Sequence, residues 1–378
     1  MFTFENIYIA YKKCRKNKTN TISVLKFEQN LLDNLWQLTD DLQNRRYTIG
    51  KSICFLTHSP KLREVFAADF RDRIVHHLLI DAIEPFYERK FISDVYNNRK
   101  GKGIHQAKAR VQKFMRRELD GYYLQLDIKG FFYHLDKDIL YERLCEDLRY
   151  MSFGDTKPTM SLPNKKLDDI LWLARSIIYH NPTTNYHFQG DIRALKALAP
   201  HKTLFKISPS RGLPIGNLTS QFFANVYMNR FDHFVKRELK AQHYLRYVDD
   251  FVILEKDEEV LKRYKESIEI YLNIYLSLSL RDDSKIRKNS DGLDFLGYII
   301  RPNYSLVRRR VVSNYKQKKA IYLQKYETQK GKMNFEEIRA FLSVQASFVS
   351  HSKHANSFNL LHKVGKIDEN NPFDFDRA

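Results

Sequence analysis

The stretch that decides the fold is residues 244–254, which read YLRYVDDFVIL. Two adjacent carboxylates, Asp249 and Asp250, stand between two short apolar runs that are typical of buried strands. A tight turn would explain the aspartates cheaply, since Asp favours turns. Two neighbouring acids in an apolar hairpin also repel each other, and ionised carboxylates there need a partner. A divalent cation would supply it, and Mg²⁺ is the natural choice for oxygen ligands that also meet phosphates.

Another acid comes from an earlier strand. Residues 122–127 read YYLQLD and alternate, so that Leu124 and Leu126 face one way and Gln125 and Asp127 the other. An acid at this place can also be an ordinary strand end. Combined with the later acid pair, however, it can converge on a two-metal site. Such a site would position an attacking 3′-hydroxyl and stabilise a departing pyrophosphate.

The chain is strongly basic. Its 378 residues include 64 Lys+Arg and 45 Asp+Glu, which gives a formal net charge of +19. Hydrophobic residues make up 43% of the chain, enough for a core, so general disorder is excluded. A basic surface can simply aid solubility, but counterion release also rewards a basic groove that binds nucleic acid. On charge alone, these two interpretations remain open.

Cysteine usage and hydropathy bear on location. Cys14, Cys54 and Cys145 are few and far apart, which argues against a disulfide framework and against a Cys-based zinc site. No apolar run approaches the roughly 18 residues that a spanning helix needs, so we expect no membrane association. Residues 1–18 show no continuous apolar stretch and no small-residue cleavage site, so no secretory signal is visible. We expect a cytoplasmic protein.

The hydrophobic periodicity predicts most of the secondary structure. Helices are expected in residues 1–50 and over 73–90, 138–148, 166–179, 218–240 and 257–276. Strands are expected over 122–127, in the two runs that flank Asp249 and Asp250, and over 293–300. Basic helices are expected over about 313–365, followed by an acidic tail. Residues 150–207 suggest only an insertion.

Four motifs resemble those of reverse transcriptases, in an arrangement that runs over roughly residues 60–300. Residues 127–132, DIKGFF, resemble polymerase motif A, and residues 247–250, YVDD, resemble motif C. Residues 211–221, RGLPIGNLTSQ, resemble motif B, and residues 293–298, LDFLGY, resemble the primer-grip motif. Each match is weak alone, whereas four in the right order and spacing are strong. The resemblance implies two Mg²⁺ ions, or Mn²⁺ in their place, held by three catalytic residues, Asp127, Asp249 and Asp250.

Motif B narrows the resemblance further. Many bacterial reverse transcriptases carry Gln-Gly-x-x-x-Ser-Pro here, whereas this chain has Ile215 in place of the Gln and Gln221 in place of the Pro. That pattern is similar to the reverse transcriptases of diversity-generating retroelements, as are residues 63–73, REVFAADFRDR, and 98–103, NRKGKG. The resemblance implies error-prone copying of a template-repeat RNA into cDNA, frequently with errors opposite template adenines. The cDNA would diversify a target gene by mutagenic retrohoming, with an accessory variability determinant protein as partner, in a bacterial or phage-infected cell.

Two alternatives stay open. One is another bacterial reverse transcriptase of the retron or antiphage-defence kind, against which the motif B pattern argues. The other is a non-catalytic RNA-binding relative, against which the intact Asp127, Asp249 and Asp250 argue, because buried acids are costly without a role.

The resemblance also suggests residues that bind deoxynucleoside triphosphates (dNTPs). Phe132 lies five residues after Asp127, where related enzymes hold an aromatic that blocks a ribose 2′-hydroxyl, whereas Phe131 is expected in the core. Gly216 would let the backbone approach a nucleotide, and Ile215 would loosen discrimination at the nascent pair because it lacks the hydrogen-bonding amide. Arginine forks suit phosphate oxygens. The full set of expected dNTP contacts is Arg63, Arg73, Arg99, Lys100, Phe132, Ile215, Gly216, Asn217, Gln221 and Lys285.

Two basic stretches are candidates for the RNA template and the RNA/cDNA duplex. Residues 99–117 and 308–319 carry many Lys and Arg and no acid, although a solvated helix face would explain them as well. His351 and His354 are expected as surface residues and not as metal ligands. The expected template–primer contacts are Lys102, Arg308, Arg309, Arg310 and Lys316.

The expected fold class is α+β in a right-hand arrangement of fingers, a palm with an antiparallel sheet, and a helical thumb. The expected parts are an N-terminal helical extension (1–50), fingers (51–120), palm with motif A (121–136), a fingers/palm insertion (137–215), palm with motifs B to E (216–300), and a helical thumb and tail (301–378).

Overall fold

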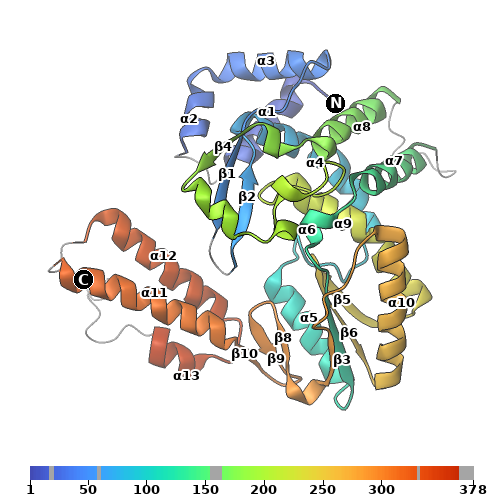
Figure 1. Cartoon of the computed structure of the whole chain (residues 1–378), viewed down its shortest axis with the longest axis vertical. Helices are drawn as coiled ribbons and strands as arrows, with labels where there is room; N and C mark the ends of the chain where they lie inside the picture. The colour runs from blue at the N-terminus through green and yellow to red at the C-terminus, as the bar shows by residue number, and fades with distance from the viewer. Residues whose placement is uncertain (17–20, 58–60, 154–163, 330–332, 366–378) are drawn as a thin grey trace.

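The computed structural model describes residues 1–16, 21–57, 61–153, 164–329 and 333–365. At its centre lies an antiparallel sheet in the strand order β5-β6-β3-β7 (Figure 1). Its strands are β3 (Tyr122–Asp127), β5 (His243–Tyr247), β6 (Asp250–Glu255) and β7 (Lys285–Lys288). The strand expected over 122–127 and the hairpin expected around the two aspartates are therefore confirmed.

Helices and a hairpin cover both faces of this sheet. On one face, Leu124 and Leu126 of β3 belong to the main core with residues of α9 (Leu218–His233) and α10 (Glu258–Leu276). On the other face, Tyr123 packs in a second core with residues of α5 (Ile104–Arg117) and of the β8–β9 hairpin. The alternation of β3 thus works as the sequence predicts, and it turns Gln125 and Asp127 towards the α5 side.

A smaller sheet and a helical layer come from the first half of the chain. The sheet has the order β2-β1-β4, with β1 and β2 antiparallel and β1 and β4 parallel. Its strands are β1 (Ser52–Thr57), β2 (Arg63–Ala67) and β4 (Tyr186–Gln189). The helices are α1 (Phe4–Arg15), α2 (Ile22–Gln29), α3 (Leu31–Gln43), α4 (Phe70–Lys90), α6 (Phe131–His134), α7 (Lys137–Phe153) and α8 (Asn164–Tyr179), followed by short 3₁₀ turns between Pro182 and Lys206.

The apolar run over 293–300 folds differently from its prediction. It forms two short strands, β8 (Leu293–Phe295) and β9 (Tyr298–Ile300), which pair with each other, and β9 also pairs with β10 (Ser305–Val307). Leu296 and Gly297 between them have φ of 52° and 89°, the pair of positive values that a tight two-residue hairpin turn requires. The expectation of a single strand was wrong because Gly297 marks a turn that the apolar pattern hides.

The C-terminal part is a helical hairpin that projects away from the rest of the chain (Figure 1). It consists of α11 (Arg309–Thr328) and α12 (Phe335–Ser352), followed by α13 (Phe358–Leu360) and a π-helical turn (Leu361–Gly365). Tyr315 and Phe348 stack at 4.0 Å between ring centroids and join the two long helices. The helices expected over 313–365 are thus confirmed, and α11 is basic as expected, whereas α12 carries Glu336 and Glu337 against Arg339. The acidic tail lies outside the described residues.

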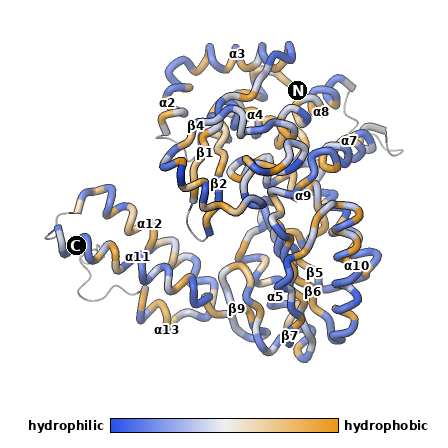
Figure 2. Tube along the Cα trace, viewed as in Figure 1, coloured by the Kyte–Doolittle hydropathy of each residue, from blue (hydrophilic) through white to orange (hydrophobic). Residues whose placement is uncertain are grey.

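Hydropathy follows this architecture. Figure 2 shows hydrophobic residues gathered in the central strands, whereas the outer helices alternate between hydrophobic and hydrophilic positions. Within the described part of the chain, every helix is too short or too polar to cross a lipid bilayer. The α+β class with antiparallel sheets is confirmed.

Candidate active site

The three aspartates of the two motifs meet at one end of the central sheet. Asp127, the last residue of β3, lies directly opposite Asp250, the first residue of β6. Asp249 precedes Asp250 and lies in the two-residue turn that joins β5 to β6. The Asp249 carbonyl oxygen accepts a hydrogen bond from the Ile128 N–H at 3.3 Å. The arrangement follows from local sequence, because the buried apolar flanks of the hairpin must pair and leave the acids at its tip.

The carboxyl groups of the site have raised pKa values. Burial raises the pKa of Asp250 to about 8; the Gln125 side chain opposes this shift by donating a hydrogen bond, while Asp127, Asp249 and Asp294 add to it. Burial raises the pKa of Asp249 to about 6, and the charge of Asp127 adds to that rise. Burial also raises the pKa of Asp127. Full ionisation of all three acids therefore requires added positive charge.

A cavity of about 490 Å³ opens beside Asp127 and Asp250. Carboxylates and cations share its wall, which suits a ligand that carries both phosphates and divalent cations. The charged residues that line it are Lys61, Asp127, Asp250, Arg281, Asp283, Lys285, Arg287, Asp294, Arg308 and Arg310.

The aspartates are not gathered as a finished metal site. Among the described residues, no group of three or more His, Cys, Asp or Glu side chains is arranged to hold a metal ion. Asp127 instead accepts a hydrogen bond from the Arg281 guanidinium at 2.9 Å, and Asp250 accepts one from the Gln125 amide at 3.2 Å. The donors themselves fit Mg²⁺, since they are carboxylate oxygens. A bound cation would lower the raised pKa values of these carboxyl groups. Binding would require Asp127 and Asp250 to exchange these partners for the ion.

Arg281 is a residue of this site that sequence reasoning missed, as are Lys61 and Arg287 of the cavity wall. The Arg281 backbone N–H donates to the Asp127 carbonyl oxygen at 2.9 Å, and its guanidinium bridges the carboxylates of Asp127 and Asp283 at 2.9 and 2.8 Å. The sequence offers only a weak signal, a cation amid acids in the segment before β7. Its proximity to Asp127 depends on chain pairing across 154 residues, which local patterns do not reveal.

Phe132 and the motif B loop lie side by side. The Leu213 N–H donates to the Phe132 carbonyl oxygen at 2.8 Å, which ties the loop to α6. Phe131 is buried in the core, as expected, while Phe132 is only partly buried. Gly216 has φ of 122°, and a Cβ there would come within 2.7 Å of the Val65 side chain. Gly216 is exposed to solvent, and its backbone also packs closely against β2.

The other motif B residues are either packed inside the protein or exposed to solvent. Ile215 is partly buried against a small core that includes Phe66 and Leu204, and Gln221 is exposed on α9. The Asn217 side chain is buried and accepts a hydrogen bond from the Ala68 N–H at 3.1 Å. Asn217 thus joins two chain segments through its side-chain oxygen, and its expected contact with a nucleotide stays a prediction.

The cations expected to bind phosphate differ in whether they lie near the three aspartates. The positive charges of Arg63 and Lys61 reach the site, where both lower the pKa of Asp249 against the effect of burial. Arg73 donates to the Ala68 carbonyl oxygen at 2.7 Å, and Lys100 is exposed beside Glu84. Arg99 lies inside the protein, where its side chain is only 6% exposed and pairs with Glu88, so its contact with a triphosphate stays a prediction.

The expected template–primer cations lie near one another, with one exception. Arg308 and Arg310 line the cavity, and Arg308 forms an ion pair with Asp294 at 3.0 Å. Arg309 and Lys316 are exposed on α11. Lys285, which is expected at the dNTP, is exposed on β7 at the cavity wall. Lys102 is turned inward, since its ammonium group donates to the Ser93 carbonyl oxygen at 2.6 Å and lies over the Tyr96 ring.

Comparison with known proteins gives distant likenesses. The chain matches no protein-family model. It is 25% identical over 319 residues to Protein YkfC of Escherichia coli strain K12, in an alignment that covers 74% of this chain and 72% of that protein.

Two solved telomerase structures are similar at 11% identity. Telomerase from Candida albicans, in complex with a TWJ fragment of telomeric RNA, has a TM-score of 0.46 and is matched over 86% of this chain and 58% of that chain. Apo telomerase from Candida tropicalis also has a TM-score of 0.46, over 85% and 60%. The chain thus spans about three fifths of the length of the telomerase chains it matches.

Proposed function

We propose that the chain is a nucleic-acid polymerase that copies RNA into DNA by metal-assisted nucleotidyl transfer. The observation that carries this proposal is the convergence of Asp127, Asp249 and Asp250 at one end of the central sheet, beside a cavity whose other charged residues are largely cations. Carboxylates whose pKa values are raised and that face Lys and Arg side chains suit a triphosphate held through divalent ions.

The parts of the chain take the roles of a polymerase hand in this proposal. The sheet of β3, β5, β6 and β7 with α9 and α10 is the palm, β1 and β2 with their surroundings belong to the fingers, and α11 with α12 is the thumb. Template RNA and the RNA/cDNA duplex would lie between the palm and α11, whose first turn brings Arg308 and Arg310 to the cavity.

The residues around the three acids have distinct tasks in the reaction. Bound Mg²⁺ would lower the cost of charge on the attacking 3′-hydroxyl and on the departing pyrophosphate. Asp127 and Asp250 orient the reacting groups from neighbouring strands. Lys61 and Arg63 come from the β1–β2 side, where their charges lower the pKa of Asp249, and in this proposal they balance the negative charge of the triphosphate.

Primer extension on an RNA template in the presence of Mg²⁺ tests this function. Asp249→Asn should abolish extension because it removes a metal ligand without changing the size of the side chain. Asp168→Asn, an exposed residue of α8, is the matched control and should extend like the wild type. Equal extension by the Asp249 variant and the wild type would reject the enzyme.

Sugar selection gives a finer test of the same proposal. Phe132 is partly exposed beside the motif B loop, whereas its neighbour Phe131 is buried in the core. Phe132→Ala should admit ribonucleotides because it removes the bulk that would meet the 2′-hydroxyl. An unchanged ratio of ribonucleotide to deoxynucleotide incorporation would exclude Phe132 as the selecting residue.

We further propose the diversity-generating type, in which a template-repeat RNA is copied with errors and an accessory variability determinant protein takes part. The support is the motif B pattern, with Ile215 and Gln221 where many bacterial relatives carry Gln and Pro. Ile215→Gln should change the error spectrum opposite template adenines; an unchanged spectrum would contradict the role of Ile215. A retron-like or antiphage-defence enzyme would copy RNA without that error bias, and a non-catalytic relative would bind RNA without copying it.

A further inference from the structure

The turn that carries Asp249 contains a strained residue. Val248 has φ of 60°, a left-handed conformation that a β-branched side chain rarely adopts. It stands between Tyr247, which ends β5, and the two aspartates. Any relaxation of its backbone would rotate the following peptide and re-aim Asp249, so the position of the acids depends on what holds this one residue.

Both backbone polar groups of Val248 are held by side chains from elsewhere in the fold. Its N–H donates to Oδ1 of Asn97 at 3.0 Å, and its carbonyl oxygen accepts from Nη1 of Arg246 at 2.9 Å. The amide nitrogen of Asn97 is buried and has no hydrogen-bond partner among the described residues. Among the described residues, the Asn97 side chain therefore makes its hydrogen bond through its oxygen, the atom that accepts from the Val248 N–H.

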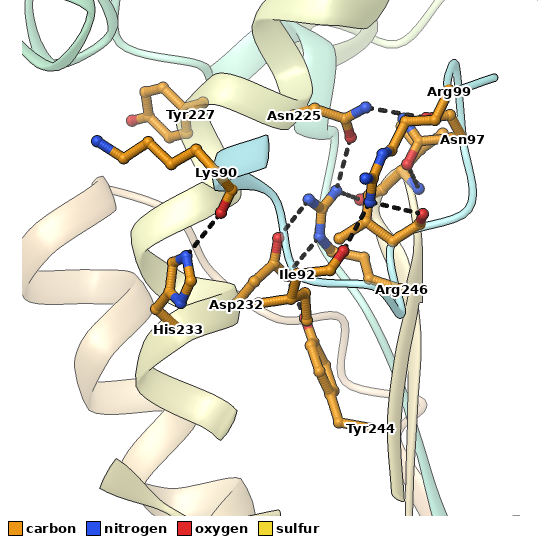
Figure 3. Close-up of polar contacts among 12 residues, drawn as sticks. Lys90, Ile92, Asn97, Arg99, Asn225, Tyr227, Asp232, His233, Tyr244 and Arg246 are labelled. Carbon is orange, nitrogen blue, oxygen red and sulfur yellow. Dashed lines mark hydrogen bonds and ion pairs between the residues drawn. The ribbon is translucent and has the colours of Figure 1, made fainter. Parts of the chain in front are cut away.

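Arg246 is in turn fixed by a fully buried network that Figure 3 shows around its guanidinium. Nε and Nη2 donate to the two carboxylate oxygens of Asp232 at 2.8 and 2.6 Å. The Tyr244 hydroxyl donates to Asp232 at 2.6 Å, and Oδ1 of Asn225 accepts from Arg246 at 3.3 Å. Two-pronged pairing of this kind fixes orientation as well as distance, so it aims the remaining Nη1 donor at Val248.

The loop that carries Asn97 is locked to the same network. The Asn97 carbonyl oxygen accepts from the Asn225 amide at 2.9 Å. The loop also runs along β5, where the Arg246 N–H donates to the Asp94 carbonyl oxygen at 3.0 Å and the Tyr96 N–H donates to the Arg246 carbonyl oxygen at 3.0 Å. Arg99 closes the loop by donating to the carbonyl oxygens of Ile92 and Val95 at 2.6 and 3.4 Å.

We propose that Asn97 and Arg246 are positioning residues, which hold Val248 in its left-handed conformation so that Asp249 and Asp250 stay aimed at the metal site opposite Asp127. The set Asn97, Asn225, Asp232, Tyr244 and Arg246 is called the turn clamp below. The inference rests on the proposed function in that it assigns the acids to metal binding. It adds that the metal site is preorganised from behind by groups that touch neither metal nor nucleotide.

A rescue experiment on the full-length chain tests the turn clamp. Asn97→Ala removes the acceptor of the Val248 N–H, so Mn²⁺ binding to the nucleotide-free protein, followed by electron paramagnetic resonance, should weaken about 10- to 100-fold. Glycine adopts a positive φ without support. Val248→Gly in the Asn97→Ala background should therefore recover most of the lost Mn²⁺ affinity.

Controls separate positioning from general damage. Asn289→Ala also removes a buried asparagine, one whose side-chain amide donates to the Glu118 carbonyl oxygen, so it should leave Mn²⁺ affinity unchanged. Arg246→Lys keeps a cation beside Asp232 but loses the fork that reaches Val248, so its affinity should fall like that of Asn97→Ala. Melting temperatures of all variants show whether folding is intact.

The outcomes distinguish the inference from the proposed function. Unchanged Mn²⁺ affinity in Asn97→Ala, or a loss that Val248→Gly does not restore in a folded double variant, overturns the turn clamp even if the wild type extends primers. A wild type that shows the expected Mn²⁺ behaviour but no primer extension overturns the polymerase and leaves the positioning role standing. A wild type that binds no Mn²⁺ overturns both.

Discussion

Metal affinity of the candidate site should depend steeply on pH, because the ion must displace protons. Burial raises the pKa of Asp250 to about 8 and that of Asp249 to about 6. At pH 7, one unit from each value, Asp250 is about ten-to-one protonated and Asp249 about ten-to-one ionised. Binding of an ion to both carboxylates at pH 7 should therefore release about one proton.

The expected size of the effect follows from these two values. Between pH 6 and pH 8 the apparent affinity for Mn²⁺ should rise about tenfold per pH unit, or about 100-fold in all, and then level off above pH 8. Electron paramagnetic resonance titrations of the nucleotide-free protein, in buffers that do not bind the metal, measure this directly. A change of less than about threefold over that range would refute the assignment of Asp250 as a protonated metal ligand.

Asp250→Asn is the matched control for this prediction. It removes the group with the higher pKa and leaves Asp249, whose pKa of about 6 is raised by burial and by Asp127. Overall affinity should be weaker in this variant because a ligand is lost. Its pH dependence between pH 6 and pH 8 should shrink to about twofold, since Asp250 no longer titrates and Asp249 is already about half ionised at pH 6.

Three further predictions concern groups around the site. Arg281→Met should strengthen Mn²⁺ binding about two- to fivefold, since the half-exposed Arg281–Asp127 ion pair competes with the metal; weaker binding would contradict this. Gly216→Ala should destabilise the fold by about 1–3 kcal/mol in urea unfolding, because φ of 122° and a Cβ at 3.0 Å from the Phe66 carbonyl oxygen strain it, and a loss below about 0.5 kcal/mol would show that the loop adapts. Burial lowers the pKa values of His105 and His351 below 6.5, so the stability these neutral rings contribute is present above pH 6.5 and lost as pH falls. Hydrogen-exchange protection factors in α12, corrected for the intrinsic pH dependence of exchange, should therefore fall from pH 7 to pH 5, and equal protection factors would argue against it.

The sequence predicts the centre of the fold well because its decisive patterns are local. The alternation of residues 122–127 and the two apolar runs around Asp249 and Asp250 are enough to give β3, β5 and β6. Their pairing then brings Asp127 opposite Asp250 without further information, since both acids stand at strand ends. Long amphipathic stretches likewise give α4 and α10 to within a few residues.

The features that the sequence does not reveal depend on partners distant in the chain. Residues 285–288, KIRK, have the composition of a solvated loop, yet they form β7 because β3 offers a free edge. Arg99 belongs to a run of cations that predicts a nucleic-acid surface, but a single acid, Glu88, draws its side chain inward. Charge patterns show how many cations a segment carries and not which of them turn away from solvent.

The sequence contains a pattern that indicates the turn clamp, although the predictions made from the sequence did not use it. Asn225, Asn229 and Asp232 recur on one face of α9, a helix most of whose residues are buried. A buried ion pair such as Asp232–Arg246 contributes little net stability compared with an apolar replacement, because desolvation offsets the attraction. A glycine at position 248 would also remove the strain that Val248 carries. The presence of both costly features beside the proposed catalytic acids is better explained by the need to fix the direction of two carboxylates than by stability.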